Sequence, residues 1–195
     1  MAAGETRERI IWTPQGLFAA RGYADVSTGD IAAAVGVTKA TLYYHFRGKP
    51  AIYAAVMCAV LQAIARGIRE IAGGPEPVRD RLYRLAEIAM IEVQPNADLD
   101  SMMRDAAHHV TAEQRAEIDR AWGAYTGAYE ELMRDGIARG ELKPLDPRLL
   151  AFAFRHLLEA FADRRGTAMG FRGRRSVVDI VVDLFLEGAA DRPAG

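Results

Sequence analysis

Cysteine and long apolar runs are scarce in this chain. Its single cysteine, Cys58, excludes an intramolecular disulfide framework and is typical of a reducing cytoplasm. No uninterrupted apolar run approaches the roughly 20 residues that span a bilayer. The first residues, MAAGETRERI, are charged and lack the apolar core of a signal peptide. We therefore expect a cytoplasmic protein that makes no use of a membrane.

Sequence motifs that carry catalysis or bind metal are also absent. The chain has no His-x-x-x-His, Cys-x-x-Cys or glycine-rich phosphate loop. His108 and His109 are adjacent, so on a helix they point about 100° apart and cannot chelate one ion together. Cys58 has apolar neighbours and is expected to be inert, and His156 fits a packed or interface histidine better than a base. We expect no enzyme activity, no metal and no cofactor.

Composition and charge favour a folded protein whose N-terminal part is mildly basic. Of the 195 residues 50% are hydrophobic, and the net charge of −1 does not suit a protein that coats nucleic acid electrostatically. Residues 1–50 carry six basic and four acidic side chains, a net +2, so the remainder carries −3. This distribution is compatible with DNA contact through residues 1–50.

Two capped helices follow one another in the segment VSTGDIAAAVGVTKATLYYHF. Ser27 and Asp30 have the spacing of a capping box, and Thr38 has the position of an N-cap before the second helix. Gly36 lies where the first helix must stop, because a glycine commonly ends a helix. Two short helices joined by about three residues with a glycine in the turn predict a helix-turn-helix.

The second of these helices, residues 39–45, has an unusual outer face. Leu42 and Phe46 lie on one side and are expected to be buried, whereas Ala40 and Tyr44 point almost directly away from them. The alternative is an ordinary amphipathic helix whose aromatic side chains fill a core, but such a helix would not place a tyrosine opposite its apolar stripe. Hydrogen-bonding groups border the outer face: Lys39, Thr41, Tyr43 and His45.

At this point the sequence resembles a known family. The segments ETRERII, LFAARGYADVS, DIAAAVGVTKATLYYHF and GKPAIYAAVM look like the DNA-binding head of TetR-type (tetracycline-repressor-like) regulators, over about residues 6–57. The resemblance implies an all-α fold with a three-helix helix-turn-helix head. A long fourth helix then leads into an α-helical body for effector binding and dimerisation. The implied domains are residues 1–48 and residues 49–195.

The resemblance also implies which residues contact DNA, with residues 39–45 entering the major groove. Base edges or thymine methyls are the implied partners of Ala40, Thr41 and Tyr44. Backbone phosphates are the implied partners of Lys39, Tyr43, His45 and Lys49. The start of the preceding helix can hold a further phosphate through Ser27 and Thr28.

Several positions depart from the family pattern: Gly48 and Pro50 at the start of the long helix are tolerable, whereas Pro14 and Gly29 matter more. Pro14 falls within the first helix, where a straight helix from Thr6 to Ala20 would lose a hydrogen bond at a cost of roughly 3 kcal/mol. The alternative is a break at Trp12, with Thr13 as N-cap and Pro14 at the tolerated first position. Gly29 stands where the family often has a side chain that reaches DNA, so one contact is expected to be missing.

The body is predicted to be helical as well. Periodicity places helices at about 77–93, 101–108, 111–139, 147–165 and 176–188. Residues 164–175 are rich in glycine and arginine and are expected to form a solvated loop. Three pairs supply helix starts: Thr111 with Gln114, Asp146 with Pro147, and Ser176 with Asp179.

A stripe of large side chains marks a candidate effector pocket. Trp122, Tyr125, Tyr129 and Met133 are spaced by three and four and share one helical face. Ordinary core packing explains such stripes in most proteins. Since the family binds effectors within its body, we also expect a ligand-binding role, completed by Tyr83, Met90, Met102 and Met103. Few charges fall on these faces, which favours a largely apolar ligand.

The last two predicted helices carry large apolar residues on more than one face, so we expect them to pack on a second copy in a homodimer. The predicted function is a transcriptional regulator that binds a double-stranded, pseudo-palindromic operator as a dimer. Repression relieved by a small-molecule effector is the favoured form. The alternatives are an activator, a constitutive regulator, or a helical ligand-binding protein whose head has lost affinity for DNA.

Overall fold

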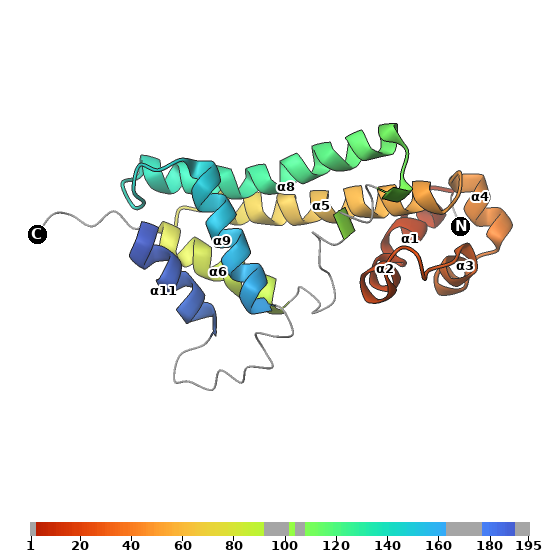
Figure 1. Cartoon of the computed structure of the whole chain (residues 1–195), viewed down its shortest axis with the longest axis horizontal. Helices are drawn as coiled ribbons and strands as arrows, with labels where there is room; N and C mark the ends of the chain where they lie inside the picture. The colour runs from red at the N-terminus through yellow and green to blue at the C-terminus, as the bar shows by residue number, and fades with distance from the viewer. Residues whose placement is uncertain (1–2, 92–101, 104–107, 163–176, 190–195) are drawn as a thin grey trace, which may run out of the picture. The chain divides into compact units, whose positions relative to one another are not determined.

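The computed structural model describes residues 3–91, 102–103, 108–162 and 177–189, and every element in these ranges is a helix (Figure 1). The expected all-α class is confirmed. The chain divides into two compact units. The head unit consists of Met1–Ala63 and Asn96–Gly123, and the body unit of Ile64–Pro95 and Ala124–Gly195. The predicted functional boundary after residue 48 stays a prediction.

The head unit begins with a broken helix. Helix α1 spans Ala3–Trp12 and α2 spans Gln15–Arg21, so the straight helix is wrong and the break at the proline is confirmed. Pro14 itself, rather than Thr13, takes the cap position of α2 and is buried. The break follows from proline's missing N–H, which is tolerated at a helix start and not in a helix interior. The three-helix head therefore becomes four short helices before the long one.

The first helix of the helix-turn-helix is capped as predicted. Helix α3 spans Thr28–Val35, and its capping box is complete. The Asp30 amide donates to Ser27 Oγ at 3.1 Å, and the Ser27 amide donates to Asp30 Oδ2 at 2.8 Å. Gly36 ends the helix at φ 72° and ψ 40°, a left-handed conformation that favours glycine.

Helix α4, Lys39–His45, starts at the predicted cap. Thr38 Oγ1 accepts a hydrogen bond from the Thr41 amide at 3.1 Å. Leu42 and Phe46 are buried, which confirms the predicted inner face. Helices α3 and α4 contact each other, with Ile31, Val35 and Leu42 buried.

Two long helices run through both units. Helix α5 spans Lys49–Ala72, and α8 spans Ala112–Ala138 with the predicted Thr111–Gln114 box in place. Within the described ranges α5 alone is long and apolar enough to cross a membrane by length and composition. Half of its most apolar window is buried in the protein (50%), as in a core helix.

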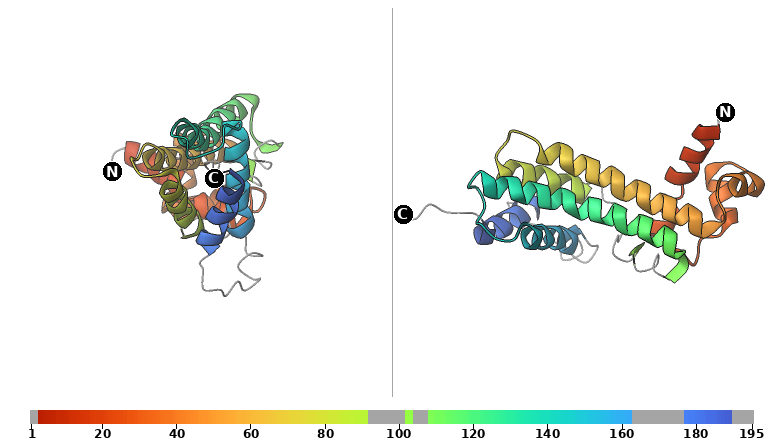
Figure 2. Two further views of the ribbon diagram at one scale, coloured as in Figure 1. Left: turned by 90° about the vertical axis from the view of Figure 1, so that its left-hand side faces the viewer. Right: turned by 90° about the horizontal axis from the view of Figure 1, so that it is seen from above.

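The body unit packs three further helices together. Helices α6 (Val78–Ile91), α9 (Pro147–Ala162) and α11 (Val177–Ala189) contact one another, and Figure 2 shows α9 beside α11. The predicted helices near these positions are confirmed to within a few residues. The Asp146 cap is confirmed, because its Oδ1 accepts from the amide of Arg148 at 2.9 Å. Outside the described residues lie most of the predicted helix 101–108, the loop 164–175 and the Ser176 cap.

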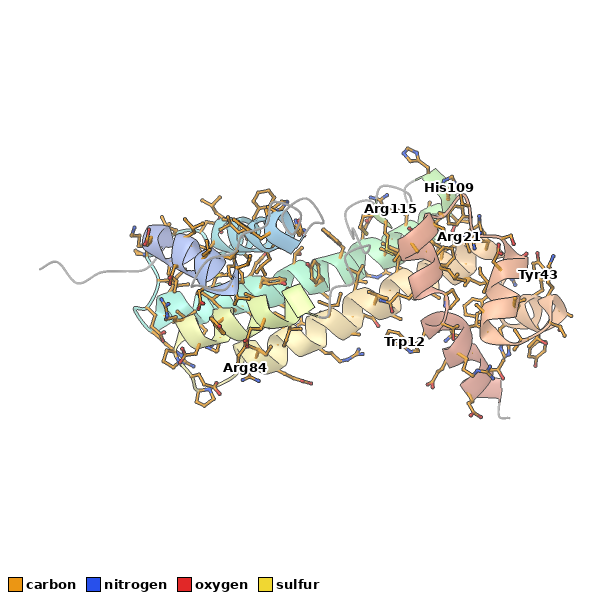
Figure 3. The ribbon with its side chains drawn as sticks, turned by 90° about the horizontal axis from the view of Figure 1, so that it is seen from below. Trp12, Arg21, Tyr43, Arg84, His109 and Arg115 are labelled. Atoms are coloured by element: carbon orange, nitrogen blue, oxygen red, sulfur yellow. The ribbon has the colours of Figure 1, made fainter. Side chains whose placement is uncertain are left out.

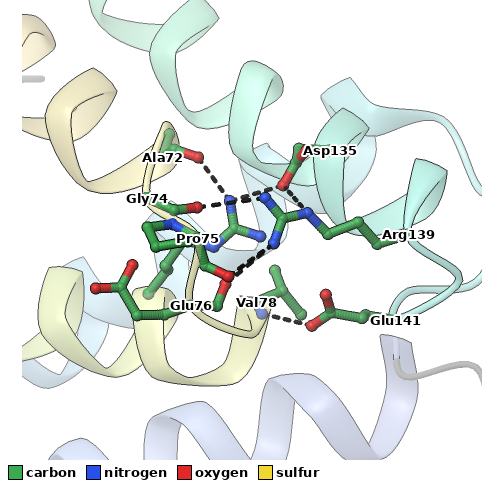
Figure 4. A network of polar contacts seen from close by, with 9 residues as sticks. Ala72, Gly74, Pro75, Glu76, Val78, Asp135, Arg139 and Glu141 are labelled. Carbon is green, nitrogen blue, oxygen red and sulfur yellow. Dashed lines mark hydrogen bonds and ion pairs between the residues drawn. The ribbon is translucent and has the colours of Figure 1, made fainter.

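Charged side chains hold the connection between α5 and α6 (Figure 4). The fully buried Arg81 places Nη1 2.6 Å from the carbonyl oxygen of Ala72 and 2.7 Å from Asp135 Oδ2. Arg139 Nε lies 2.9 Å from the same carboxylate oxygen. The two terminal nitrogens of Arg139 donate to the carbonyls of residues 74–76 at 3.2 to 3.3 Å. We call this arrangement the body clamp.

Candidate nucleic-acid interface

The outer face of α4 is open to solvent. Tyr43 is 56% exposed and Tyr44 80%, and Figure 3 shows Tyr43 on the surface of the head unit. Lys39 and Ala40 are exposed as well. Exposed tyrosines opposite a buried apolar stripe bring hydrogen-bonding groups to the surface of a helix, where they can reach a groove of DNA.

Thr41 and His45 lie at the edge of this face and are half-buried. The hydroxyl oxygens of Thr38 and Thr41 are 2.9 Å apart, so the two side chains share a hydrogen bond. The His45 ring stands edge-on to the Tyr44 ring, with centroids 5.0 Å apart. These contacts limit the rotamers of both side chains before any DNA binds.

Lys39 reaches back to the start of α3. A Cβ placed on Gly29 would lie 3.3 Å from Lys39 Cε, 3.5 Å from Lys39 Nζ and 3.4 Å from Ser27 Oγ. The lysine therefore covers the place that a side chain at position 29 would take. Its ammonium group, the Ser27 hydroxyl and the first amides of α3 gather at one helix N-terminus, which is a favourable place for a phosphate.

Lys49 has a different setting from the other predicted phosphate contacts. Its Nζ donates to the carbonyl oxygens of Tyr23 at 2.7 Å and Val26 at 2.8 Å, with Ala24 at 3.4 Å. An ammonium group has three donors, and here all three face backbone carbonyls. This geometry differs from the phosphate contact that the resemblance implies for Lys49.

In the body unit, the predicted ligand residues Tyr125, Tyr129 and Met133 are buried on α8. The rings of Tyr125 and Tyr129 meet edge-on, with their centroids 5.6 Å apart. The centroid of the Tyr129 ring lies 6.4 Å from that of Phe154 on α9. Burial raises the pKa of Tyr125 to about 12 and raises that of Tyr129 well above its ordinary value. Both phenols are therefore neutral at physiological pH.

A charge pair beside these tyrosines, with its arginine buried and its glutamate half-buried, was missed by the sequence reasoning. Arg155 of α9 is buried, pairs with Glu159 and hydrogen-bonds the Tyr125 hydroxyl. These charges come from α9, which is not among the helix faces that were predicted to line the pocket. Arg155 and Glu159 are four residues apart in the apolar stretch PRLLAFAFRHLLEAFA. This spacing is the sequence signal that could have indicated the pair.

The other predicted ligand residues are divided between the two units. Met102, Met103 and Trp122 belong to the head unit, where Met102 is buried and the other two are half-buried. Tyr83 is half-buried on α6 of the body unit. The side chain of Met90 lies outside the described residues. The pocket as predicted therefore stays untested.

Two observations on the described residues concern metal ions and the single cysteine. Within it no three side chains among His, Cys, Asp and Glu are arranged to hold a metal ion. Burial, and then the charge of Glu117, raises the pKa of the Cys58 thiol, which is the opposite of the shift that activates a nucleophilic cysteine.

The fold and this surface define a helix-turn-helix protein with an α-helical body. The chain belongs to the TetR family of bacterial transcriptional regulators. The model of bacterial regulatory proteins of the tetR family matches residues 16–56, and that of the tetracyclin repressor-like C-terminal domain matches residues 75–189.

Among curated proteins the chain is similar to several regulators. It is 29% identical to the HTH-type transcriptional regulator SrpR of Pseudomonas putida over 116 residues, 60% of this chain and 46% of SrpR. It is 25% identical to the regulator EthR of Mycobacterium tuberculosis over 138 residues, 68% of this chain and 64% of EthR. The chain thus spans less than two thirds of both proteins. The nucleoid occlusion factor SlmA of Marinobacter nauticus is 27% identical over 73% of this chain and 72% of its own length.

Solved structures share the fold at low identity. Reduced NemR of Escherichia coli superposes with a TM-score of 0.75 at 16% identity, covering 95% of this chain and 98% of NemR. The TetR-family regulator PfmR of Thermus thermophilus gives a TM-score of 0.66 at 21% identity, covering 92% of this chain and 97% of PfmR. These likenesses show the fold alone.

Proposed function

We propose that this regulator binds a pseudo-palindromic operator as a homodimer, represses transcription there, and is released by a small molecule. The observation that carries the proposal is the exposed face of α4, where Tyr43 and Tyr44 are open to solvent while Leu42 is buried. On this reading Ala40, Thr41 and Tyr44 meet base edges.

The remaining predicted contacts hold the backbone. Lys39, Tyr43 and His45 would meet phosphates beside the groove, and Ser27 and Thr28 a phosphate at the start of α3. The proximity of Lys39 to Ser27 supports a shared phosphate. Lys49 does not join this set, because its donors face carbonyls.

Exposed apolar side chains support the homodimer. Leu149 and Phe152 on α9 and Leu184 on α11 each expose more than half of their surface. Apolar residues gathered in this way on two adjacent helices favour contact with a second copy through an isologous interface. Two copies would present two α4 helices to successive half-sites, about one helical turn or somewhat more apart.

The effector is proposed to bind beside Tyr125 and Tyr129 in the body. The Arg155–Glu159 pair adds hydrogen-bonding capacity to an otherwise apolar surrounding, so a largely apolar ligand with one polar group fits best. Binding would favour a body conformation that is less suited to the operator, which shifts an existing equilibrium.

A gel-shift titration against the promoter region beside the chain's own gene tests DNA binding, and light scattering at micromolar concentration tests the dimer. A specific shift and a dimer mass support the proposal; a monomer mass contradicts it. A folded dimer that shifts no promoter DNA favours the alternative of a helical ligand-binding protein with a weakened head. The relative SlmA is named a nucleoid occlusion factor, which is a role other than promoter control. The same titration tests whether this chain binds a promoter.

A further inference from the structure

The turn between α2 and α3, residues Tyr23–Val26, is held from α5. Lys49 lies in the first turn of α5, and its ammonium group binds the carbonyls of Tyr23 and Val26 at 2.7 and 2.8 Å. The same Nζ lies 4.0 Å from the centroid of the Tyr23 ring, a cation–π contact. One side chain thus fixes both the backbone of the turn and its aromatic ring.

The ring of Tyr23 is also held by the segment that precedes α8. The His109 ring stacks on it with centroids 4.3 Å apart and planes 14° apart. Tyr53 of α5 meets the Tyr23 ring edge-on at 5.0 Å, and the Tyr53 hydroxyl donates to the carbonyl of Met102 at 2.9 Å. Residues far apart in the sequence therefore meet at one buried tyrosine within the head unit.

The position of this turn matters for DNA because Ser27 follows it directly. Val26, whose carbonyl Lys49 holds, precedes the cap of α3, so a shift of the turn moves the Ser27 hydroxyl and the first amides of α3. These are the groups proposed to hold a phosphate. A displacement of about 1 Å is enough to weaken hydrogen bonds, which have a narrow range of distances.

We propose that the Tyr23–Val26 turn is a junction that couples the DNA-binding surface to the segment before α8. In this junction Lys49 is a positioning residue, not a phosphate ligand, and His109 carries the link to α8. The proposal rests on the proposed DNA binding. It assigns Lys49 a role opposite to that expected from its place in the sequence.

The salt dependence of DNA affinity separates the two roles of Lys49. The probe is a duplex that the wild-type protein selects from a random pool. Lys49→Met keeps most of the apolar stem and removes the ammonium, so affinity should fall about tenfold because its hydrogen bonds are removed, with the salt slope unchanged. The control, Lys39→Met, should lower the slope by about 0.9 for each phosphate that the protein no longer neutralises.

A slope reduced in Lys49→Met as much as in Lys39→Met would overturn the positioning role, and so would an unchanged affinity. Tyr23→Leu provides a second variant that retains every charge, in case Lys49→Met does not fold. It should also lower affinity without changing the slope, and wild-type affinity for Tyr23→Leu would overturn the proposal.

Hydrogen exchange tests the link to α8. By reciprocity, duplex binding should slow amide exchange in residues 110–116 as well as in residues 27–31. His109→Ala should abolish the protection of residues 110–116 and leave that of residues 27–31. The matched control, His108→Ala, should keep both. Protection confined to residues 27–31, or equal behaviour of the two histidine variants, overturns the link.

The free protein distinguishes a failure of this proposal from a failure of the proposed function. If the wild-type chain selects no duplex over random sequence, the proposed DNA binding fails. Exchange without DNA still decides the role of Lys49, because Lys49→Met should speed exchange of residues 26–31 about tenfold if the ammonium holds the turn. Exchange that is the same in the two proteins overturns that role.

Discussion

Cationic side chains hold two helix connections in this molecule by different means. In the head unit, the ammonium group of Lys49 meets only backbone carbonyls and an aromatic ring. In the body clamp, the guanidinium groups of Arg81 and Arg139 share the carboxylate of Asp135 and also bind carbonyls. Among the described residues Lys49 has no carboxylate partner.

The difference bears on what each connection can do. A buried guanidinium with a shared carboxylate is fixed in geometry and costly to disturb, because a charge would be left unpaired. An ammonium on carbonyl dipoles loses less when the acceptors shift, since its donors can rotate to new ones. The body clamp therefore suits a rigid anchor, whereas the Lys49 contacts hold the turn but allow small adjustments.

Removing the shared carboxylate should give the largest effect. Two guanidinium nitrogens of the buried Arg81 already lack a hydrogen-bond partner among the described residues, and Asp135→Ala also removes the carboxylate that pairs with its Nη1. We expect a loss of about 3–5 kcal/mol in the free energy of unfolding, measured by urea denaturation. The control Asp119→Ala, which breaks the exposed pair with Arg115 on the same helix, should cost less than about 1 kcal/mol. Similar losses in the two variants would mean that the body clamp is no anchor.

At alkaline pH the tyrosines Tyr125 and Tyr129 of the body unit should affect the free energy of unfolding more than Tyr23 of the head unit. The pKa of Tyr125 is raised to about 12, so the unfolded chain loses this proton first and stability falls as pH rises from about 10 to about 12. The loss should reach about 2–3 kcal/mol for Tyr125, with a further contribution from Tyr129. Unfolding at pH 9 and pH 11 should show a flatter dependence in the double variant Tyr125→Phe, Tyr129→Phe.

The head tyrosine provides the comparison for this pH dependence. Burial raises the pKa of Tyr23 in the same direction but without a large shift. Tyr23→Phe should therefore leave most of the alkaline loss in place. If Tyr23→Phe flattened the pH dependence of the free energy of unfolding as much as the double variant Tyr125→Phe, Tyr129→Phe does, the expected difference between the two units would be wrong.

A methyl group added next to the body clamp should destabilise it. A Cβ on Gly136 would lie 2.9 Å from both Leu142 Cδ1 and Val78 Cγ2, which are buried. Gly136→Ala is expected to cost about 1–3 kcal/mol through overpacking. Gly127→Ala on the same helix meets nothing within 4 Å and should stabilise by up to about 1 kcal/mol. Thermal unfolding of the two variants should therefore shift in opposite directions, and shifts of the same sign would refute the packing argument.

The smallest effect is expected at the cap of α3. Ser27→Ala removes the acceptor for the Asp30 amide and should cost about 1 kcal/mol. Native-state hydrogen exchange should locate this loss in residues 28–35 and leave the body helices unchanged. A loss that spreads evenly over both units would show that the head does not open separately.

Local signals in the sequence predicted much of the fold and of the proposed DNA surface. Capping residues such as Ser27 and Thr38 act within three residues of themselves, so their partners can be read from spacing alone. The break at Pro14 follows from the chemistry of one residue. The exposure of Tyr44 and the burial of Leu42 follow from helical phase.

Contacts between distant segments could not be predicted in this way. The carbonyl partners of Lys49 lie 23 to 26 residues away, and backbone acceptors carry no side-chain signal. Arg155 reaches Tyr125 from a different helix. The predicted set of ligand residues includes members of both units, and whether they line one pocket stays a prediction.

The central claim is that the outer face of α4 reads a DNA sequence. The most direct test is a fluorescence anisotropy titration of the chain into the duplex it selects from a random pool and into a shuffled duplex of equal composition, at fixed salt. We predict that the selected duplex binds at least about a thousandfold more tightly. Tyr44→Ala should reduce this ratio by about tenfold or more. Equal affinity for the two duplexes, or a ratio that Tyr44→Ala leaves intact in a folded protein, would contradict the account.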